Sequence, residues 1–264
     1  MNVRNLAAVL LLVTSVDLVY AEPTQFDMFD NRIYVTGGAN IGVLHNNWNQ
    51  TAKIFAGDAG LGVEKLFPTT RVWLDFELSN LFSYHELDDN LTQSPKNPVP
   101  FDPKFFSMNL KLGRAFQVVG NDLQLTPYAL VGKNGNLSPY TVLNTAVEQN
   151  QVKYINSGLN NFFWTTGIGG RLEYAVADTF DFYLDENLNY NLDNSKIQSP
   201  FVKQNNLELV NLIGAKWQAW RELQFAVEGY YNYQHYLLSQ PEAQNSQFNP
   251  FMNFGTRFVV GLTF

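Results

Sequence analysis

The stretch FGTRFVVGLTF, residues 254–264, decides the fold class because two kinds of side chain alternate strictly along it. One face carries Phe254, Thr256, Phe258, Val260, Leu262 and Phe264, and the other carries Gly255, Arg257, Val259, Gly261 and Thr263. Side chains two positions apart share one face of a β-strand, so this segment predicts a strand with two different faces. The stretch FDFYLDENLNYNL, residues 180–192, repeats the pattern with Asp, Tyr and Asn along its polar face.

Ten segments of this kind follow one another along the chain. They cover residues 32–44, 51–66, 71–84, 105–116, 123–133, 162–176, 179–192, 207–220, 223–236 and 253–264. Strands of soluble proteins average about five or six residues, whereas a tilted strand needs about 9 to 11 to cross a bilayer. We therefore predict an all-β fold: a single antiparallel up-and-down transmembrane β-barrel of ten strands, with eight strands as the alternative.

The connections between these segments alternate in length. Short turns are expected at residues 67–70, 119–122, 177–178 and 221–222, and long connections at 85–104, 134–161, 193–206 and 237–252. Bacterial outer-membrane barrels have short periplasmic turns and long extracellular loops, so the pattern predicts the cell outer membrane as the location.

Composition excludes several other classes. The 264 residues include no cysteine, carry a formal charge of −7, and are 15% aromatic but only 16% charged, with a mean hydropathy of −0.18. A helical membrane protein needs apolar runs of about 20 residues, a disordered chain is poor in aromatics, and disulfides and zinc–thiolate sites need cysteine. An acidic chain lacks the basic surface for nucleic acid. We expect no metal, no cofactor and no nucleic-acid partner.

The N-terminus resembles a secretory signal peptide. Arg4 precedes the unbroken apolar run Leu6–Val13, and Val19-Tyr-Ala21 is a small-x-small site that predicts cleavage between Ala21 and Glu22. The expected organisation is a signal peptide at residues 1–21 and a barrel domain at residues 22–264, in which residues 22–31 form a short periplasmic lead-in.

Several stretches resemble the superfamily of small bacterial outer-membrane β-barrels, the OmpA-like and opacity-type surface proteins. They are LTPYALVG at residues 125–132, GGRLEYAV at 169–176, and the C-terminal FVVGLTF at 258–264. The last is similar to the signal read by the barrel-assembly machinery, and the resemblance assigns that signal to Phe258, Val260, Leu262 and Phe264. The usual member has eight strands; ten would fit the opacity-type adhesins or the omptin proteases. The group includes adhesins, structural proteins, narrow channels and enzymes, so the resemblance implies location more than activity.

Ionisable residues of both signs fall on the predicted inner face. They are Asp58, Glu64, Asp75, Glu77, Lys111, Arg171, Glu173, Asp181, Asp185, Glu208, Lys216, Glu228 and Arg257. They could form a selectivity lining of a pore, or cross-link a filled, hydrated interior by ion pairs. We favour the filled interior, although inward glycines are expected to leave gaps through which water passes.

Two groups of residues are predicted on the outer face of the barrel. Aromatic residues near strand ends are expected to form interfacial girdles: Trp164, Trp217, Trp220, Tyr84, Tyr174 and Tyr233. Glu186 and Asn211 violate the apolar pattern, and mark either a β-bulge, which we prefer, or a contact between protomers.

The histidines give little support for catalysis. His45, His85 and His235 are expected near extracellular strand ends. An omptin-like protease needs an Asp pair facing an Asp–His pair; Asp88 and Asp89 could supply the first, but no Asp-x-His element occurs. A lipid-modifying hydrolase needs Ser, His and an acid together, and no serine partner is evident. We predict no enzymatic activity and no catalytic residue.

The long connections are the expected contact regions. Loops on a rigid scaffold commonly carry binding, which favours a structural or adhesin-like surface protein, with a narrow channel for ions or small solutes as the alternative. The expected partners are outer-membrane lipid and lipopolysaccharide, the assembly machinery, and a host or surface ligand of the loops.

Overall fold

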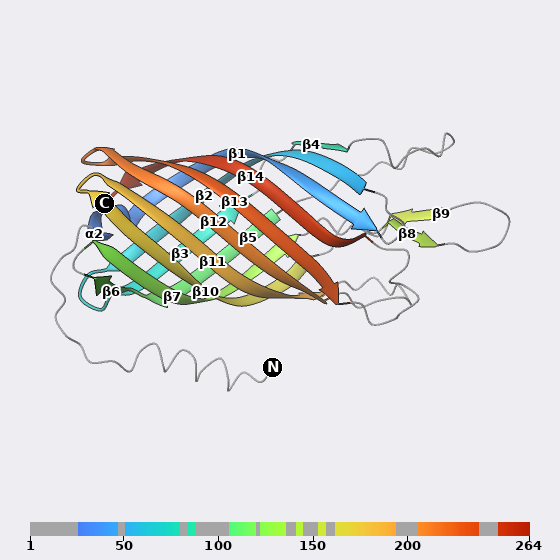
Figure 1. Ribbon diagram of the computed structural model, residues 1–264, viewed down its shortest axis with the longest axis horizontal. Helices are drawn as coiled ribbons and strands as arrows, with labels where there is room; N and C mark the ends of the chain where they lie inside the picture. The colour runs from blue at the N-terminus through green and yellow to red at the C-terminus, as the bar shows by residue number, and fades with distance from the viewer. Residues whose placement is uncertain are drawn as a thin grey trace, which may run out of the picture.

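The computed structural model describes residues 26–46, 51–79, 84–87, 106–119, 122–135, 141–144, 153–156, 162–193, 205–237 and 248–264. These residues form a closed antiparallel β-barrel (Figure 1). The strand β1 (Asn31–Asn46) pairs with both β2 and the last strand, β14, so the sheet has no free edge. The predicted ten-stranded, up-and-down transmembrane barrel is confirmed.

Around the barrel the strands follow chain order. After β1 come β2 (Thr51–Phe67), β3 (Val72–Ser79), β5 (Phe106–Arg114), β7 (Leu123–Gly135), β10 (Phe162–Ala177), β11 (Phe180–Asp193), β12 (Asn205–Trp220), β13 (Leu223–Leu237) and β14 (Phe248–Thr263). Turns of a few residues join these strands at one end of the barrel, which we call the short-turn end. The long connections start and finish at the other, the loop end.

Two short strands lie at the ends of expected segments. β4 (Tyr84–Leu87) begins where the third expected segment ends and pairs with β2, as β3 does. β6 (Phe116–Val119) follows β5 after Ala115 and, like β5, pairs with β7. The expected loop at residues 134–161 contains a small hairpin of β8 (Thr141–Asn144) and β9 (Lys153–Asn156), which lies at the loop end (Figure 1).

The outer surface of the barrel is an apolar belt. Ile168 and Ile213 are each 63% exposed, and the residues of the assembly signal all point outward. In a folded protein, apolar side chains exposed in a continuous belt mark a surface that lies against lipid. Trp217, Trp220 and Tyr174 lie on this surface near the short-turn end, and Trp164 near the loop end, as a girdle requires.

The expectation of a β-bulge at Glu186 and Asn211 is wrong. These residues face each other directly across β11 and β12, and the register is continuous on both sides of them. Glu186 is exposed and Asn211 half-buried, each near the middle of its strand. The two side chains, which we call the polar pair, therefore belong to the outer wall.

Residues 26–30 of the expected lead-in form a plug in the end of the barrel. Residues Phe26–Asp30, a one-turn helix α2 (Phe26–Phe29) and the residue after it, lie at the short-turn end near the C-terminus (Figure 1). Phe26, Phe29 and Asp30 are completely buried, and Phe26 packs with Leu66 and Trp73. A backbone hydrogen bond from Asp30 N to Phe26 O, 2.9 Å, closes the turn of the plug, and one from Leu66 N to Asp30 O, also 2.9 Å, fixes the plug to β2. Among the described residues, no helix is long and apolar enough to span a membrane.

Candidate functional site

The structure places all thirteen predicted ionisable residues on the inner wall of the barrel. Because successive residues on one face of a strand are two positions apart, the inward side chains of each strand form a row along the barrel axis. The rows combine into three layers between the short-turn end and the loop end. From one end to the other these are a charged cluster, a tyrosine layer and an amide layer.

The charged cluster, nearest the plug, consists of Asp30, Arg32, Glu64, Arg171, Glu173, Asp181 and Lys216, all at most 4% exposed. Lys216 Nζ lies 2.8 Å from Asp30 Oδ1 and 2.9 Å from Glu173 Oε1. Arg171 joins β10 to β2 across the interior, with 2.9 Å between its guanidinium and Glu64 Oε1. Arg32 Nε donates to the other oxygen of Glu64 at 2.8 Å. The cluster links opposite walls of the barrel to one another and to the plug.

Asp30, which precedes the first membrane-crossing strand, is the carboxyl group that joins the plug to this cluster. Burial raises its pKa well above the ordinary value, and the negative charge of Glu173 raises it further, while Lys216 acts in the opposite direction. Gln124 Nε2 also donates to Asp30 at 3.1 Å. Arg71, in the turn before β3, donates to Asp27 at 2.7 Å, so the plug is held by polar contacts on several sides.

The tyrosine layer fills the middle of the barrel. Tyr34 donates to Asp75 at 2.9 Å, Tyr128 donates to Asp185, and Tyr183 donates to Glu228. Two cations cross the layer. Lys111 on β5 lies 2.6 Å from Asp185 on β11, and Arg257 on β14 lies 2.6 Å from Glu77 on β3 and also pairs with Glu228.

Inward glycines do not leave gaps in this layer, contrary to expectation. Each of four tyrosines lies over a glycine directly opposite it on the neighbouring strand: Tyr34 over Gly62, Tyr128 over Gly169, Tyr183 over Gly214, and Tyr230 over Gly255. A Cβ atom on Gly214 would lie 2.3 Å from Tyr183 Cζ. Glycine is required there because a tyrosine ring occupies the space of the side chain.

The amide layer lies toward the loop end. Glu208, which is 5% exposed, accepts hydrogen bonds from four carboxamides: Asn189 at 3.4 Å, Asn191 at 3.1 Å, Asn232 at 2.5 Å and Gln234 at 3.0 Å. Asn134 and Thr165 extend this network toward β7 and β10. Asp58, the remaining predicted residue, is half-buried on β2.

The structure places the three histidines on three different strands. His45 lies in β1, His85 in β4 and His235 in β13, where its side chain is exposed. Among the described residues, no group of three or more His, Asp or Glu side chains could hold a metal ion. Asp88 and Asp89, the predicted signal peptide with its cleavage site at Ala21 and Glu22, and most of the long connections lie outside the described residues.

Sequence reasoning missed the plug and the Tyr–Gly pairs. The plug residues gave no periodic pattern, and the pairs depend on register across strands. The available signal was the presence of both glycines and tyrosines at inward positions, of which the glycines alone predicted gaps.

Neither a protein-family model nor a curated protein matches the chain. Solved structures do resemble it. The COG4313 outer membrane channel from Pseudomonas putida F1 is 9% identical, with 94% of this chain and 100% of that chain covered and a TM-score of 0.43. The translocator domain of the autotransporter NalP from Neisseria meningitidis is 12% identical (99% and 96% covered; TM-score 0.39).

Neisserial surface protein A is 13% identical, with 88% of this chain and 97% of that chain covered and a TM-score of 0.33. At such identities and TM-scores, the likeness carries no information on role. Barrel closure, an apolar outer belt and a polar inner wall nevertheless agree with the resemblance drawn from the sequence. The chain is a closed antiparallel β-barrel with ten strands.

Proposed function

We propose that this chain is a barrel closed to solutes, which serves as a structural or adhesin-like surface protein through its loops. The observation that supports closure is the set of ion pairs that cross the interior. Arg171 to Glu64, Lys111 to Asp185 and Arg257 to Glu77 each join strands that are three or more positions apart around the barrel. Together with the buried plug, they occupy the path that a solute would take.

The role of the loops is supported by the arrangement of the connections. Residues 88–105 and 238–247, for example, join strands at the loop end, while turns of two residues join β10 to β11 and β12 to β13 at the other end. A rigid barrel that carries long segments on one side suits contact with a surface or a host ligand. Replacing 88–105 and 238–247 by short Gly-Ser linkers should abolish adhesion conferred on a non-adherent Gram-negative host. Unchanged adhesion would contradict this role.

A narrow channel is the second candidate, and the amide layer is the observation that favours it. Asn and Gln side chains around Glu208 would suit a hydrated passage. The charged cluster and the plug lie on the same axis, however, so a solute that entered from the loop end would have to displace them.

Conductance in planar lipid bilayers separates these two functions. A closed barrel gives no discrete openings with the unmodified protein. Removal of the plug anchors by Lys216→Met together with Arg71→Ala is then expected to produce openings. Openings in the unmodified protein that change in size when Asp185→Asn or Arg257→Gln is introduced would overturn the closed barrel and establish the channel.

We also propose that the chain is not an enzyme. His235 points outward, away from the carboxylates of the inner wall, so it has no acidic partner there. Purified protein should lack protease and lipid-hydrolase activity. Activity that His85→Ala abolishes would contradict this proposal.

A further inference from the structure

The polar pair, Glu186 and Asn211, lies on the apolar outer wall of the barrel, where polar side chains are unfavourable. Leu184 and Leu188 flank Glu186 on the same face of β11, and they are 39% and 50% exposed. Within the described residues, neither Glu186 nor Asn211 makes a side-chain hydrogen bond or an ion pair. A carboxylate and a carboxamide thus sit beside each other in the middle of the apolar belt.

Lipid cannot satisfy these groups at this depth. Acyl chains offer no hydrogen-bonding atoms, and lipid headgroups lie at the membrane surfaces rather than near the middle of the strands. Charged side chains on the lipid face of a barrel are destabilising, most of all near the midplane. The partner that completes the pair must therefore be another protein surface that crosses the membrane and presents polar groups at the same depth.

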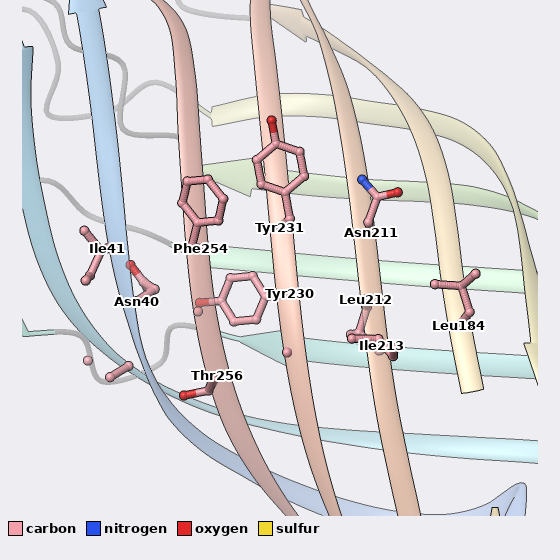
Figure 2. Close-up of a pocket in the computed structure, with 14 residues that line it drawn as sticks. Asn40, Ile41, Leu184, Asn211, Leu212, Ile213, Tyr230, Tyr231, Phe254 and Thr256 are labelled. Carbon is pink, nitrogen blue, oxygen red and sulfur yellow. The ribbon is translucent and has the colours of Figure 1, made fainter. Parts of the chain in front are cut away.

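The wall beside the pair is recessed in a way that allows such a surface to approach. A groove of about 940 Å³ runs from β12 to β1 over the small outward residues Gly229, Thr256 and Ala39. Figure 2 shows Asn211 at one side of this groove, next to Tyr231 and Phe254, which continue its row across β13 and β14. On the other side of Glu186, Gly170 has no atoms within 4 Å of the position of a Cβ, so the pair is accessible from both directions.

We infer that this face, the outer wall of β10 to β13 around the polar pair, is the interface of a homodimer. In a two-fold dimer with its axis along the membrane normal, the same residues of both copies meet at the same depth. Asn211 of each copy can then donate to Glu186 of the other, so two reciprocal hydrogen bonds satisfy all four side chains. The pair is complementary to itself, and this favours a second copy over any unrelated partner. The inference is independent of whether the barrel conducts.

Site-specific cross-linking in lipid vesicles tests this geometry. The chain has no cysteine, so Leu188→Cys introduces a single thiol beside the pair without changing either member. The matched control is Leu61→Cys, which is 41% exposed on β2, five strands from β11 in both directions around the barrel. A short bis-maleimide should join two Leu188→Cys chains into a covalent dimer and leave Leu61→Cys monomeric.

Variants of the pair test the chemistry. In the Leu188→Cys background, Glu186→Leu or Asn211→Leu should weaken association about tenfold, because both reciprocal hydrogen bonds are lost. Glu186→Gln should retain most of it, since a carboxamide still accepts from Asn211. Leucine on a lipid-facing strand suits the bilayer, and intact folding is checked by resistance to unfolding in detergent.

Three outcomes would overturn the inference. If the unmodified protein and Leu188→Cys stay monomeric at every protein-to-lipid ratio, no dimer forms through this face. If dimers persist unchanged in Glu186→Leu and Asn211→Leu, the pair does not hold them. Native mass spectrometry of the monomer distinguishes the lipid alternative. A bound phospholipid that Glu186→Leu releases would assign the groove to lipid instead.

Discussion

Lys216→Met tests whether the charged cluster holds the barrel together. Lys216 is completely buried, and its ammonium group lies within 3 Å of carboxylate oxygens of Asp30 and Glu173. Glu64 and Asp181 lie farther away, at 3.8 and 4.0 Å. The cluster contains four carboxylates and three cations, so loss of Lys216 leaves two cations for four buried acids. Removal of one member of a buried ion pair costs about 3–5 kcal/mol, and we expect a loss of unfolding free energy in that range.

Urea unfolding in lipid vesicles at neutral pH, followed by tryptophan fluorescence, measures this loss. Lys65→Met is the matched control, because Lys65 contacts the ring of Phe264 at 4.5 Å and should contribute about 1 kcal/mol or less. In the double variant Lys216→Met, Asp30→Asn, part of the loss should return, since one unpaired acid has been removed. If the unfolding free energy of Lys216→Met lies within about 1 kcal/mol of the parent's, the reasoning is refuted, because the buried cation then does not stabilise the fold through its two close carboxylates.

Two further variants test the plug and the Tyr–Gly pairs. Gly214→Ala should cost about 1–3 kcal/mol of unfolding free energy, because its Cβ would displace the ring of Tyr183. The control Gly37→Ala, where a Cβ meets nothing within 4 Å, should change the unfolding free energy by about 0.5 kcal/mol or less. Equal effects of the two variants in urea titrations would show that the Tyr–Gly pairing does not matter. Asp30 has a pKa raised above 3.8 in the folded protein, so the folded state keeps a proton that the unfolded chain releases, and stability should fall as pH rises from about 4 toward the folded pKa. Asp30→Asn should flatten this decline, and identical pH profiles of unfolding would contradict the assignment.

Alternation in the sequence was sufficient to predict which side chains face lipid and which face the interior. Phe258 and Leu262 on β14 are 65% and 61% exposed, and Asp181 and Asp185 on β11 are buried, as their positions require. The membrane enforces this pattern because a shift of register by one residue would transfer a whole polar face into lipid. The tight turn predicted at residues 177–178 lies at 178–179, so such turns also located the strand ends nearest to them to within one residue.

Features that depend on register across the long connections could not be predicted in the same way. Three of the four Tyr–Gly pairs, such as Tyr128 with Gly169, join two strands whose long connection lies at the loop end, where no tight turn sets the alignment. The plug was missed for a different reason. A helix of one turn, Phe26–Phe29, is too short for hydrophobic periodicity to identify, and its burial depends on contacts with β2 and β3.

The contrast between the inner and outer walls indicates where this protein makes its contacts. Inside, Glu64, Asp185 and Glu228 each accept hydrogen bonds from, or pair with, side chains of the inner wall itself. Outside, Glu186 and Asn211 have polar groups without partners among the described residues. A polar side chain that faces hydrocarbon without a hydrogen-bond partner opposes folding, because its transfer out of water costs free energy. Such side chains are therefore expected where a partner supplies the missing hydrogen bonds. The polar pair therefore supports the proposed partner at the lateral wall of the barrel, and binding there would not require the interior to open.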